Sequence, residues 1–417
     1  MGHHQISTRG LARGSGPALR GSWRCTSKAL IKSELFWLAF GLSVRAGLAL
    51  VLEPRFYQAE EDGYWSAAQG LVQHGVLGEK GLARVMSPMA PCFFSLFDAL
   101  RSARMAQALV STLTAWMIGR MTADLTGSKR AGLFALASAC VYPFYAYYSG
   151  LLVTETLYLA LLTAGSWLAC RSLKKTASNW AAAGAGFLLA LAGLTRTEAV
   201  PIAFGLWCLL LLRGLRWQSL VLALLCWALP LGGWLCRNYG VVGAFTLDTH
   251  GGVTLLHGTM FFDADRIDAS ASRQAIDLHP VLSQAKNLKE LDRDRFYKRV
   301  AMSFMRENPW TTARQWLQKA ADFWRFYPRL DPGGGRWGLV ALSLLFEPAL
   351  ICLGLWGAWR LRDLARSLWP LYWIVFSTFV VHVAAVSQMR HRLPVTPVLM
   401  LFACAWLDKR LARRERP

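Results

Sequence analysis

Charged residues are scarce in this 417-residue sequence, at 17% of the chain against about a quarter in soluble domains, whereas apolar residues make up 54%. The sequence has no CxxC pair, and most of its nine cysteines fall inside apolar stretches. It also lacks Walker and GxGxxG phosphate cradles and internal repeats. These features exclude a soluble nucleotide-binding enzyme, a secreted disulfide scaffold and a disordered chain, and they argue against a nucleotide-driven pump.

Long apolar blocks dominate the chain instead. Their residues are clustered rather than alternating with a period of 2 or 3.6, and a helix of about 20 such residues crosses a bilayer. The pattern predicts an all-α polytopic membrane protein with about ten transmembrane helices. The blocks cover residues 35–52, 103–120, 131–148, 151–170, 180–195, 198–212, 218–236, 337–358, 368–386 and 393–408.

The basic residues follow the predicted topology. The chain carries 46 Lys and Arg against 25 Asp and Glu, a formal charge of +21, and these cations gather at both ends and in short loops between apolar blocks. Lys and Arg beside a span are held on the cytoplasmic side, where they meet anionic lipid head groups. No basic-aromatic groove accompanies the charge, so it favours membrane anchoring over a nucleic-acid partner.

Two long polar segments are predicted on the far, periplasmic side of the membrane. Such loops usually carry function. The second includes helical stretches at Glu290–Met305 and Trp310–Trp324, and its tryptophans suggest a helix at the membrane interface. The expected division of the chain is a basic cytoplasmic tail (1–34), an N-terminal transmembrane module (35–236) with a catalytic first loop (53–102), a long periplasmic loop (237–336), C-terminal transmembrane helices (337–408) and a second basic tail (409–417).

Three consecutive carboxylates, Glu60, Glu61 and Asp62, open the first periplasmic loop. Adjacent like charges raise one another's pKa, which suits a general base that must accept a proton near neutral pH. Acidic residues also stabilise the start of a helix through its dipole, so a purely structural role is the alternative.

Four arginines are predicted on the same face of the membrane as these carboxylates, namely Arg196, Arg237, Arg390 and Arg392. A guanidinium group binds phosphate through forked hydrogen bonds that Lys cannot copy. Cations on this side do not serve topology anchoring, although interaction with lipid head groups remains the alternative. The acid Glu155, near the outer end of its span, should pair with a cation, and Arg196 is a plausible partner.

Metal binding has weak support. The histidines form no recognisable ligand spacing, and His250 and His257 lie seven residues apart in a Gly-rich stretch. Asp263 and Asp265 form a DxD pattern, which often holds a divalent ion but also occurs by chance. No metal site is therefore predicted, and a divalent cation remains possible.

Seven short motifs occur in one order along residues 35–408. They are Glu60-Glu61-Asp62-x-Tyr64, Pro88-Met89-Ala90-Pro91, Thr154-Glu155-Thr156, Leu194-Thr195-Arg196-Thr197-Glu198, Arg237-Asn238-Tyr239, Glu307-Asn308-Pro309 and Arg392-Leu393-Pro394. In this respect the chain resembles the bacterial membrane glycosyltransferases of the GT-C type. These include the protein O-mannosyltransferases, the aminoarabinose transferases and their smaller RgtA/B/C/D-like relatives.

The resemblance implies a GT-C-like helical bundle that transfers a sugar from a polyprenyl-phosphate donor to a glycan, lipid or protein acceptor, facing the periplasm from the bacterial inner membrane. The base would be Asp62 or one of Glu60 and Glu61. Arg196, Arg237 and Arg392 would contact the donor phosphate, and Arg390 is a further candidate for this contact. Tyr64, Glu155, His250 and His257 are expected to line the substrate cavity. A non-catalytic transporter of lipid-linked sugars or a structural membrane subunit are the alternatives, although the absence of a repeat argues against a transporter.

Overall fold

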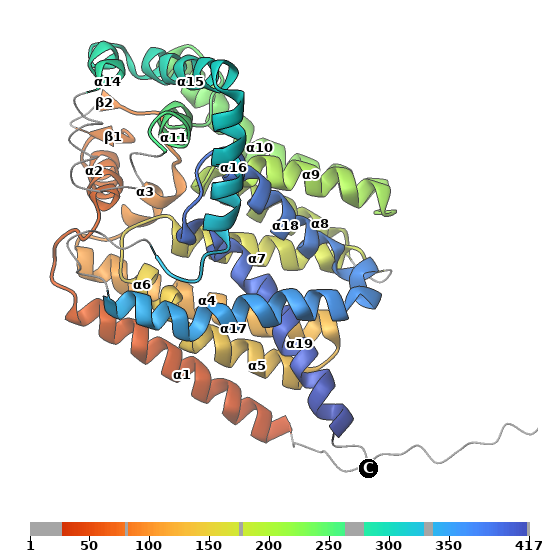
Figure 1. Cartoon of the computed structure of the whole chain (residues 1–417). Helices are drawn as coiled ribbons and strands as arrows, with labels where there is room; N and C mark the ends of the chain where they lie inside the picture. Colours follow the sequence, from red (N-terminus) through yellow and green to blue (C-terminus); the bar gives the residue numbers. More distant parts are fainter. Residues whose placement is uncertain (1–26, 80–81, 175–177, 263–278, 329–336, 415–417) are drawn as a thin grey trace, which may run out of the picture.

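The structure is a computed structural model that describes residues 27–79, 82–174, 178–262, 279–328 and 337–414. Each predicted apolar block coincides with helix, except that the block at 131–148 forms two helices. Most of these helices run side by side as a bundle (Figure 1). They are α1 (Ser27–Val51), α4 (Leu100–Thr126), α5 (Lys129–Val141), α6 (Pro143–Ser149), α7 (Glu155–Ser172), α8 (Asn179–Thr195), α9 (Ala199–Leu212), α10 (Trp217–Val242), α17 (Trp337–Arg360), α18 (Ala365–Ala384) and α19 (Thr396–Arg414).

Three helical segments among the described residues are long and apolar enough to cross a membrane, namely Leu30–Val51, Trp217–Val242 and Trp337–Arg360. Three shorter apolar helices, Asn179–Thr195, Ala199–Leu212 and the segment Leu368–Ala384, accompany them. The chain is therefore a membrane protein with a helical bundle, as predicted, and the number of about ten spans stays a prediction.

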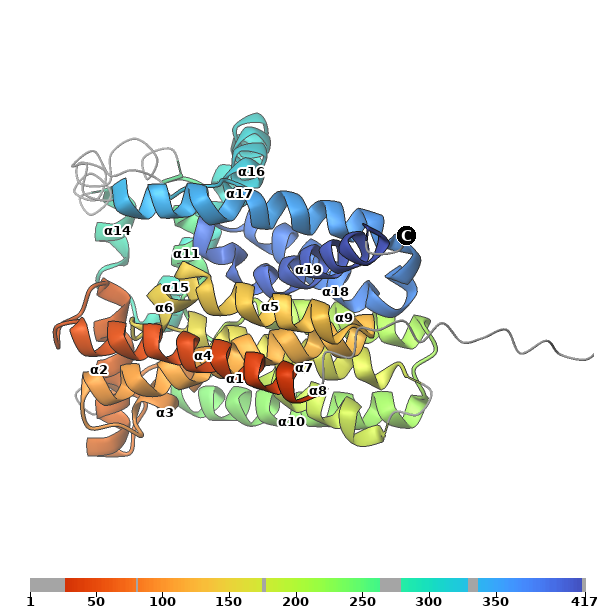
Figure 2. The same cartoon turned by 90° about the horizontal axis from the view of Figure 1, so that it is seen from below.

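The remaining elements belong mainly to the two segments predicted as periplasmic loops. Figures 1 and 2 show α2, α3, α11 and α14 together at the end of the bundle away from the C-terminus. Among the described residues, one pair of short antiparallel strands, in which Gly78 pairs with Ala83, departs from the predicted all-α fold. These elements are α2 (Ala59–His74), β1 (Gly78–Glu79), β2 (Leu82–Ala83), α3 (Met89–Phe94), α11 (Gly251–His257), α14 (Pro280–Ala285), α15 (Glu290–Glu307), α16 (Pro309–Phe323), η1 (Arg362–Leu364) and η2 (Met389–Val395).

Small residues let the helices of the bundle approach closely. A Cβ atom at Gly186 of α8 would lie 2.1 Å from the carbonyl oxygen of Ala223 in α10. Likewise, a Cβ atom at Gly357 of α17 would lie 2.3 Å from the carbonyl oxygen of Phe402 in α19. Membrane helices pack through such contacts because lipid provides no hydrophobic force between them.

Pro143 divides the apolar block at 131–148. Its ring nitrogen carries no hydrogen, so the carbonyl of Ala139 loses its helical donor at the end of α5. The fully buried Arg45 of α1 replaces that donor: Nη2 donates to the carbonyl of Ala139 at 2.9 Å and Nη1 to that of Cys140 at 3.1 Å. Its Nε donates to Ser111 Oγ at 2.8 Å. A cation thus caps the end of a helix inside the bundle.

Replacing Arg45 by Met is expected to destabilise the protein by about 1–3 kcal/mol, because the buried carbonyls would lose their donors. Thermal unfolding of purified protein in detergent measures the change. Leu50→Met, on the same helix at a side chain that is 55% exposed, should leave the melting temperature unchanged. Equal melting temperatures for both variants would contradict the capping role of Arg45.

The helix α16 turns its polar side toward the protein. Thr312, Gln315 and Lys319 are buried, whereas Trp310 is 87% and Leu317 is 74% exposed. An apolar outer face suits a helix that lies against lipid, and the interfacial position of this helix stays a prediction. Lys319 Nζ donates to the carbonyl of Ala385 at 2.7 Å, which ties α16 to the segment that leads into η2.

Candidate active site

A cavity of about 1640 Å³ lies where α2, α11 and η2 meet the ends of the bundle helices. Segments far apart in the sequence supply its polar wall. α2 contributes an acid and a tyrosine, the turn between α8 and α9 an arginine and an acid, and η2 an arginine and a histidine. The ionisable side chains used below are Glu60, Tyr64, Arg196, Glu198, His250, His257, His382, Arg390 and His391.

Glu60 and Arg390 form a forked ion pair across the cavity. Arg390 Nη1 donates to Glu60 Oε2 at 3.0 Å, and Nη2 donates to Oε1 at 2.9 Å. Glu60 lies in the first turn of α2, whose partial positive charge favours an acid there. Its side chain is 48% exposed, so the carboxylate is accessible from the cavity.

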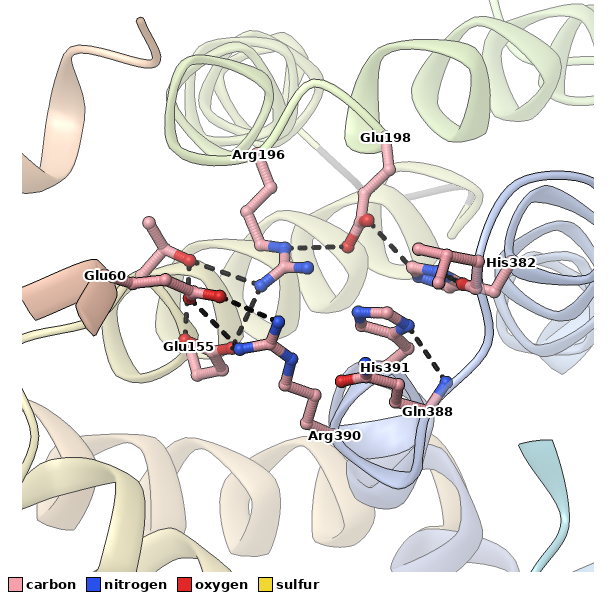
Figure 3. A network of polar contacts seen from close by, with 10 residues as sticks. Glu60, Glu155, Arg196, Glu198, His382, Gln388, Arg390 and His391 are labelled. Carbon is pink, nitrogen blue, oxygen red and sulfur yellow. Dashed lines mark hydrogen bonds and ion pairs between the residues drawn. The ribbon is translucent and has the colours of Figure 1, made fainter. Parts of the chain in front are cut away.

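Arg196 is held between two acids (Figure 3). Its Nη1 donates to Glu155 Oε1 at 3.1 Å and its Nε to Glu198 Oε1 at 3.0 Å. The pairing of Arg196 with Glu155 is therefore confirmed. Arg390 Nη1 also lies 3.9 Å from Glu155 Oε1, so this one carboxylate lies beside both arginines. Glu155 itself lines a small void next to the large cavity.

The electrostatics of the acids differ from the sequence-based expectation. Burial alone would raise the pKa of Glu60, but the charges of Arg390, Arg196 and His250 outweigh it and hold this pKa below its usual value. The expectation that neighbouring carboxylates raise one another's pKa is therefore wrong for Glu60, because its neighbours in space are cations rather than acids. Arg196 and His382 likewise lower the pKa of Glu198 against the effect of burial.

Glu61 has a structural position. It is 0% exposed; Oε1 accepts the backbone N–H groups of Tyr57 at 2.8 Å and Gln58 at 2.9 Å, and Oε2 accepts that of Leu152 at 2.9 Å. The buried Arg104 lies 3.7 Å from Oε2. This carboxylate caps the N-terminus of α2 and links it to the segment before α7. It lies outside the cavity wall.

Asp62 and Arg237 also lie outside the cavity wall. Asp62 is exposed and accepts a hydrogen bond from Ser66 Oγ at 3.2 Å within α2. Arg237 donates to the backbone carbonyl of Arg84 at 2.8 Å and lies over the ring of Trp234. The structure does not bring either residue into contact with the Glu60–Arg390 pair.

Arg392 is not part of the cavity wall, although its partner Glu347 lines the cavity. Its side chain is 1% exposed and donates to Glu347 Oε2 at 2.6 Å, to the carbonyl of Arg325 at 3.0 Å and to that of Phe323. The other oxygen of Glu347 accepts a hydrogen bond from the hydroxyl of Tyr142. These contacts place Arg392 as a buried link between η2, α17 and the end of α16.

Three further predicted residues do line the cavity, namely Tyr64, His250 and His257. Burial raises the pKa of Tyr64 to about 12, so its hydroxyl stays protonated at neutral pH. His250 precedes α11 and His257 ends it, so the Gly-rich stretch between them brings both rings to one wall.

Four residues of the cavity wall are not among the candidates that the sequence predicts, namely Glu198, Glu347, His382 and His391. Glu198 follows Arg196 by two positions, and Glu347 and His382 interrupt apolar blocks. An ionisable residue within such a block is rarely neutral to function or packing. That pattern would have identified Glu347 and His382.

No group of three or more His, Cys, Asp and Glu residues within the described part of the chain has a geometry that would hold a metal ion. The DxD pattern of Asp263 and Asp265 lies outside the described residues.

Comparison with known proteins gives a family-model match over part of the chain and a shared fold. Residues 85–232 match the family model of the dolichyl-phosphate-mannose-protein mannosyltransferases. The archaeal oligosaccharyltransferase AglB from Archaeoglobus fulgidus, solved with an inhibitory peptide and a dolichol-phosphate, superposes with a TM-score of 0.55 at 14% identity. That match covers 94% of this chain and 51% of AglB, so the chain spans about half the length of that relative.

Two structures of ArnT from Cupriavidus metallidurans are also similar. The apo form has a TM-score of 0.43 at 14% identity and covers 91% of this chain and 76% of ArnT. The form bound to undecaprenyl phosphate has a TM-score of 0.41 at 13% identity and covers 92% and 78%. No curated protein sequence matches the chain. The family-model match and the fold shared with AglB confirm the resemblance to GT-C type membrane glycosyltransferases.

Proposed function

We propose that the protein is a membrane glycosyltransferase that moves a sugar from a polyprenyl-phosphate donor to a glycan, lipid or protein acceptor. One observation carries the proposal: a carboxylate and two arginines, Glu60, Arg196 and Arg390, converge on one wall of a large cavity. The fold shared with AglB, which was solved with a dolichol-phosphate, supports a lipid-phosphate substrate. We place the protein in the bacterial inner membrane with this cavity facing the periplasm.

The cavity offers matched chemistry for both halves of the reaction. The ionised Glu60 removes the proton of an acceptor hydroxyl, whose oxygen attacks the anomeric carbon of the donor sugar. The bond from that carbon to the phosphate oxygen breaks on the opposite side, so the configuration inverts. The polyprenyl phosphate leaves with the electron pair, and Arg196 and Arg390 stabilise its charge.

The Glu60–Arg390 pair must open for this reaction to proceed. Arg390 offers both terminal nitrogens to Glu60. A phosphate competes for the same guanidinium group, and the partial exposure of both side chains leaves room for the exchange. Arrival of the donor would therefore free the carboxylate and, by removing a cation from it, make it a stronger base.

Transfer is tested with purified protein in lipid nanodiscs, radiolabelled polyprenyl-phosphate hexose or pentose, and a membrane extract as the source of acceptor. We expect label to move from the lipid-extractable donor into an acceptor fraction. The absence of transfer from every donor, together with no affinity for a polyprenyl phosphate, would refute the proposed function.

Arg390→Met is expected to weaken binding of the donor phosphate by roughly 10- to 100-fold, because one or two charge-assisted hydrogen bonds would be lost. Arg237→Met is the matched control, since this arginine lies outside the cavity wall. Titration of each variant with farnesyl phosphate, followed by tryptophan fluorescence, measures both affinities. An equal loss in the two variants would mean that the cavity arginine has no special part in phosphate binding.

A further inference from the structure

His391 lies in η2 directly after Arg390, and its ring lines the cavity. The backbone N–H of Gln388 donates to Nδ1 of this ring at 3.2 Å. A ring nitrogen that accepts a hydrogen bond from an N–H group carries no proton itself, so the proton of the neutral imidazole must lie on Nε2. The fold thus sets the tautomer of His391.

The Nε2 side of the ring faces the two arginines. Figure 3 shows this nitrogen turned away from Gln388, toward Arg196 and the end of Arg390. Within the described part of the chain, no residue accepts a hydrogen bond from it. The polar wall therefore presents an N–H donor beside two guanidinium groups.

The surroundings of His391 keep its ring neutral. Burial lowers its pKa well below the usual value, and the nearby charges of His382, Arg390 and Arg196 lower it further, against a weaker opposite effect of Glu198. The ring of His382 stacks on that of His391, with centroids 4.3 Å apart and planes 11° apart. His382 is fixed by Glu198 Oε2 at 3.2 Å from Nε2 and by the carbonyl of Val386 at 3.2 Å from Nδ1.

We propose that His391 binds the phosphate of the lipid-linked donor, with Nε2–H donating to a phosphate oxygen beside Arg196 and Arg390. This inference rests on the proposed function. A third cation at this position would be repelled by the two arginines, whereas a neutral donor adds a directed hydrogen bond without that cost. His382 and Glu198 act as positioning residues, because their contacts hold the stacked ring in place.

Two substitutions at His391 distinguish the effect of its N–H group from the effect of its aromatic ring. His391→Phe keeps an aromatic ring that can stack on His382 but removes both the Nε2–H group and the Nδ1 acceptor of Gln388. His391→Gln replaces the ring by an amide whose N–H group has a similar reach. The probe is farnesyl phosphate, with farnesol as the matched ligand that lacks a phosphate, titrated against the purified full-length protein in nanodiscs.

We expect His391→Phe to bind farnesyl phosphate about tenfold more weakly than the wild type, as for the loss of one hydrogen bond to a charged group. Its affinity for farnesol should not change, whereas its melting temperature should fall slightly because the N–H group of Gln388 loses its acceptor. His391→Gln should retain most of the affinity for farnesyl phosphate.

Wild-type affinity of His391→Phe for farnesyl phosphate would overturn the role of His391, and sugar transfer by the wild type would leave the proposed function intact. An equally weak His391→Gln would also overturn it, because the shape of the ring and not its N–H group would then matter. If the wild type binds farnesyl phosphate no better than farnesol, this inference fails together with the phosphate site of the proposed function.

Discussion

Glu60→Gln is expected to lower the rate of sugar transfer by about 10²- to 10⁴-fold, the contribution of a positioned general base. Of the three consecutive acids, only Glu60 lines the cavity and contacts a cavity arginine. The amide keeps the size of the side chain and can still contact its neighbours, so the loss would report the missing base. The measurement is the initial rate of transfer at saturating donor in nanodiscs.

Asp62→Asn is the matched control for this variant. Asp62 is exposed, lies two positions away on the same helix and contacts Ser66 instead of the cavity. Its substitution should leave the rate near that of the wild type. If Asp62→Asn loses as much activity as Glu60→Gln, the base assignment moves to Asp62 and the role of the Glu60–Arg390 pair is contradicted.

The pH dependence gives a second measurement on Glu60. Cations hold its pKa below the usual value of about 4.3, so the carboxylate is ionised at neutral pH. It is lost as a base only when pH falls through this lowered pKa. The acidic limb of kcat/KM, which reports the free enzyme, should therefore lie below the usual value. The acidic limb of kcat should lie at higher pH. Bound phosphate would pair with Arg390 in place of Glu60, so the pKa of Glu60 would be higher in the complex. If the acidic limbs of kcat and kcat/KM lie at the same pH, the exchange of Arg390 from Glu60 to the phosphate is contradicted.

The helices were predictable from the sequence because their cause is local. Apolar blocks of helical length have few alternatives in a membrane, where every backbone group must find its partner within the segment. The division at Pro143 could also be predicted from the missing N–H group. The cap that Arg45 provides could not, because Arg45 and Ala139 are separated by 94 positions in the chain.

The site was predictable only in part, because its contacts join residues that are far apart in the sequence. The types of side chain and their common face followed from the motifs, and Glu60, Arg196 and Arg390 do come together. Their roles depend on which way each side chain points. Neighbours in the sequence, such as Glu60 and Glu61, lie on different sides of α2, so one meets the cavity and the other the backbone of another segment.

Arg390 and Arg392 are only two residues apart, yet the sequence does not predict that their side chains have different partners. The first contacts Glu60 in the cavity, and the second contacts Glu347 inside the protein. The packing of η2 against α7, α18 and α19 decides this difference. The prediction that Arg392 binds the donor phosphate therefore gives way to a structural interpretation, in which its charge serves the stability of the protein.

Arg392→Met is expected to destabilise the protein by about 3–5 kcal/mol, the usual cost of leaving a buried charge without its partner. Both side chains of the Arg392–Glu347 pair are 1% exposed, so each charge depends on its hydrogen-bond partners rather than on solvent. The carbonyls of Phe323 and Arg325 would lose their donor as well. Thermal and denaturant unfolding in detergent measure the change, with Arg390→Met as the control on the same 3₁₀ helix.

The double substitution Arg392→Met with Glu347→Leu distinguishes a lost ion pair from a packing defect. Two apolar side chains in place of a buried pair are often close to neutral, because the desolvation cost of both charges disappears together. The double variant should therefore be more stable than Arg392→Met alone, with a coupling energy of about 0.5–3 kcal/mol in the mutant cycle. Additive losses, or an Arg392→Met variant as stable as the wild type, would show that Arg392 does not balance the charge of Glu347 and would return it to the candidates for the phosphate site.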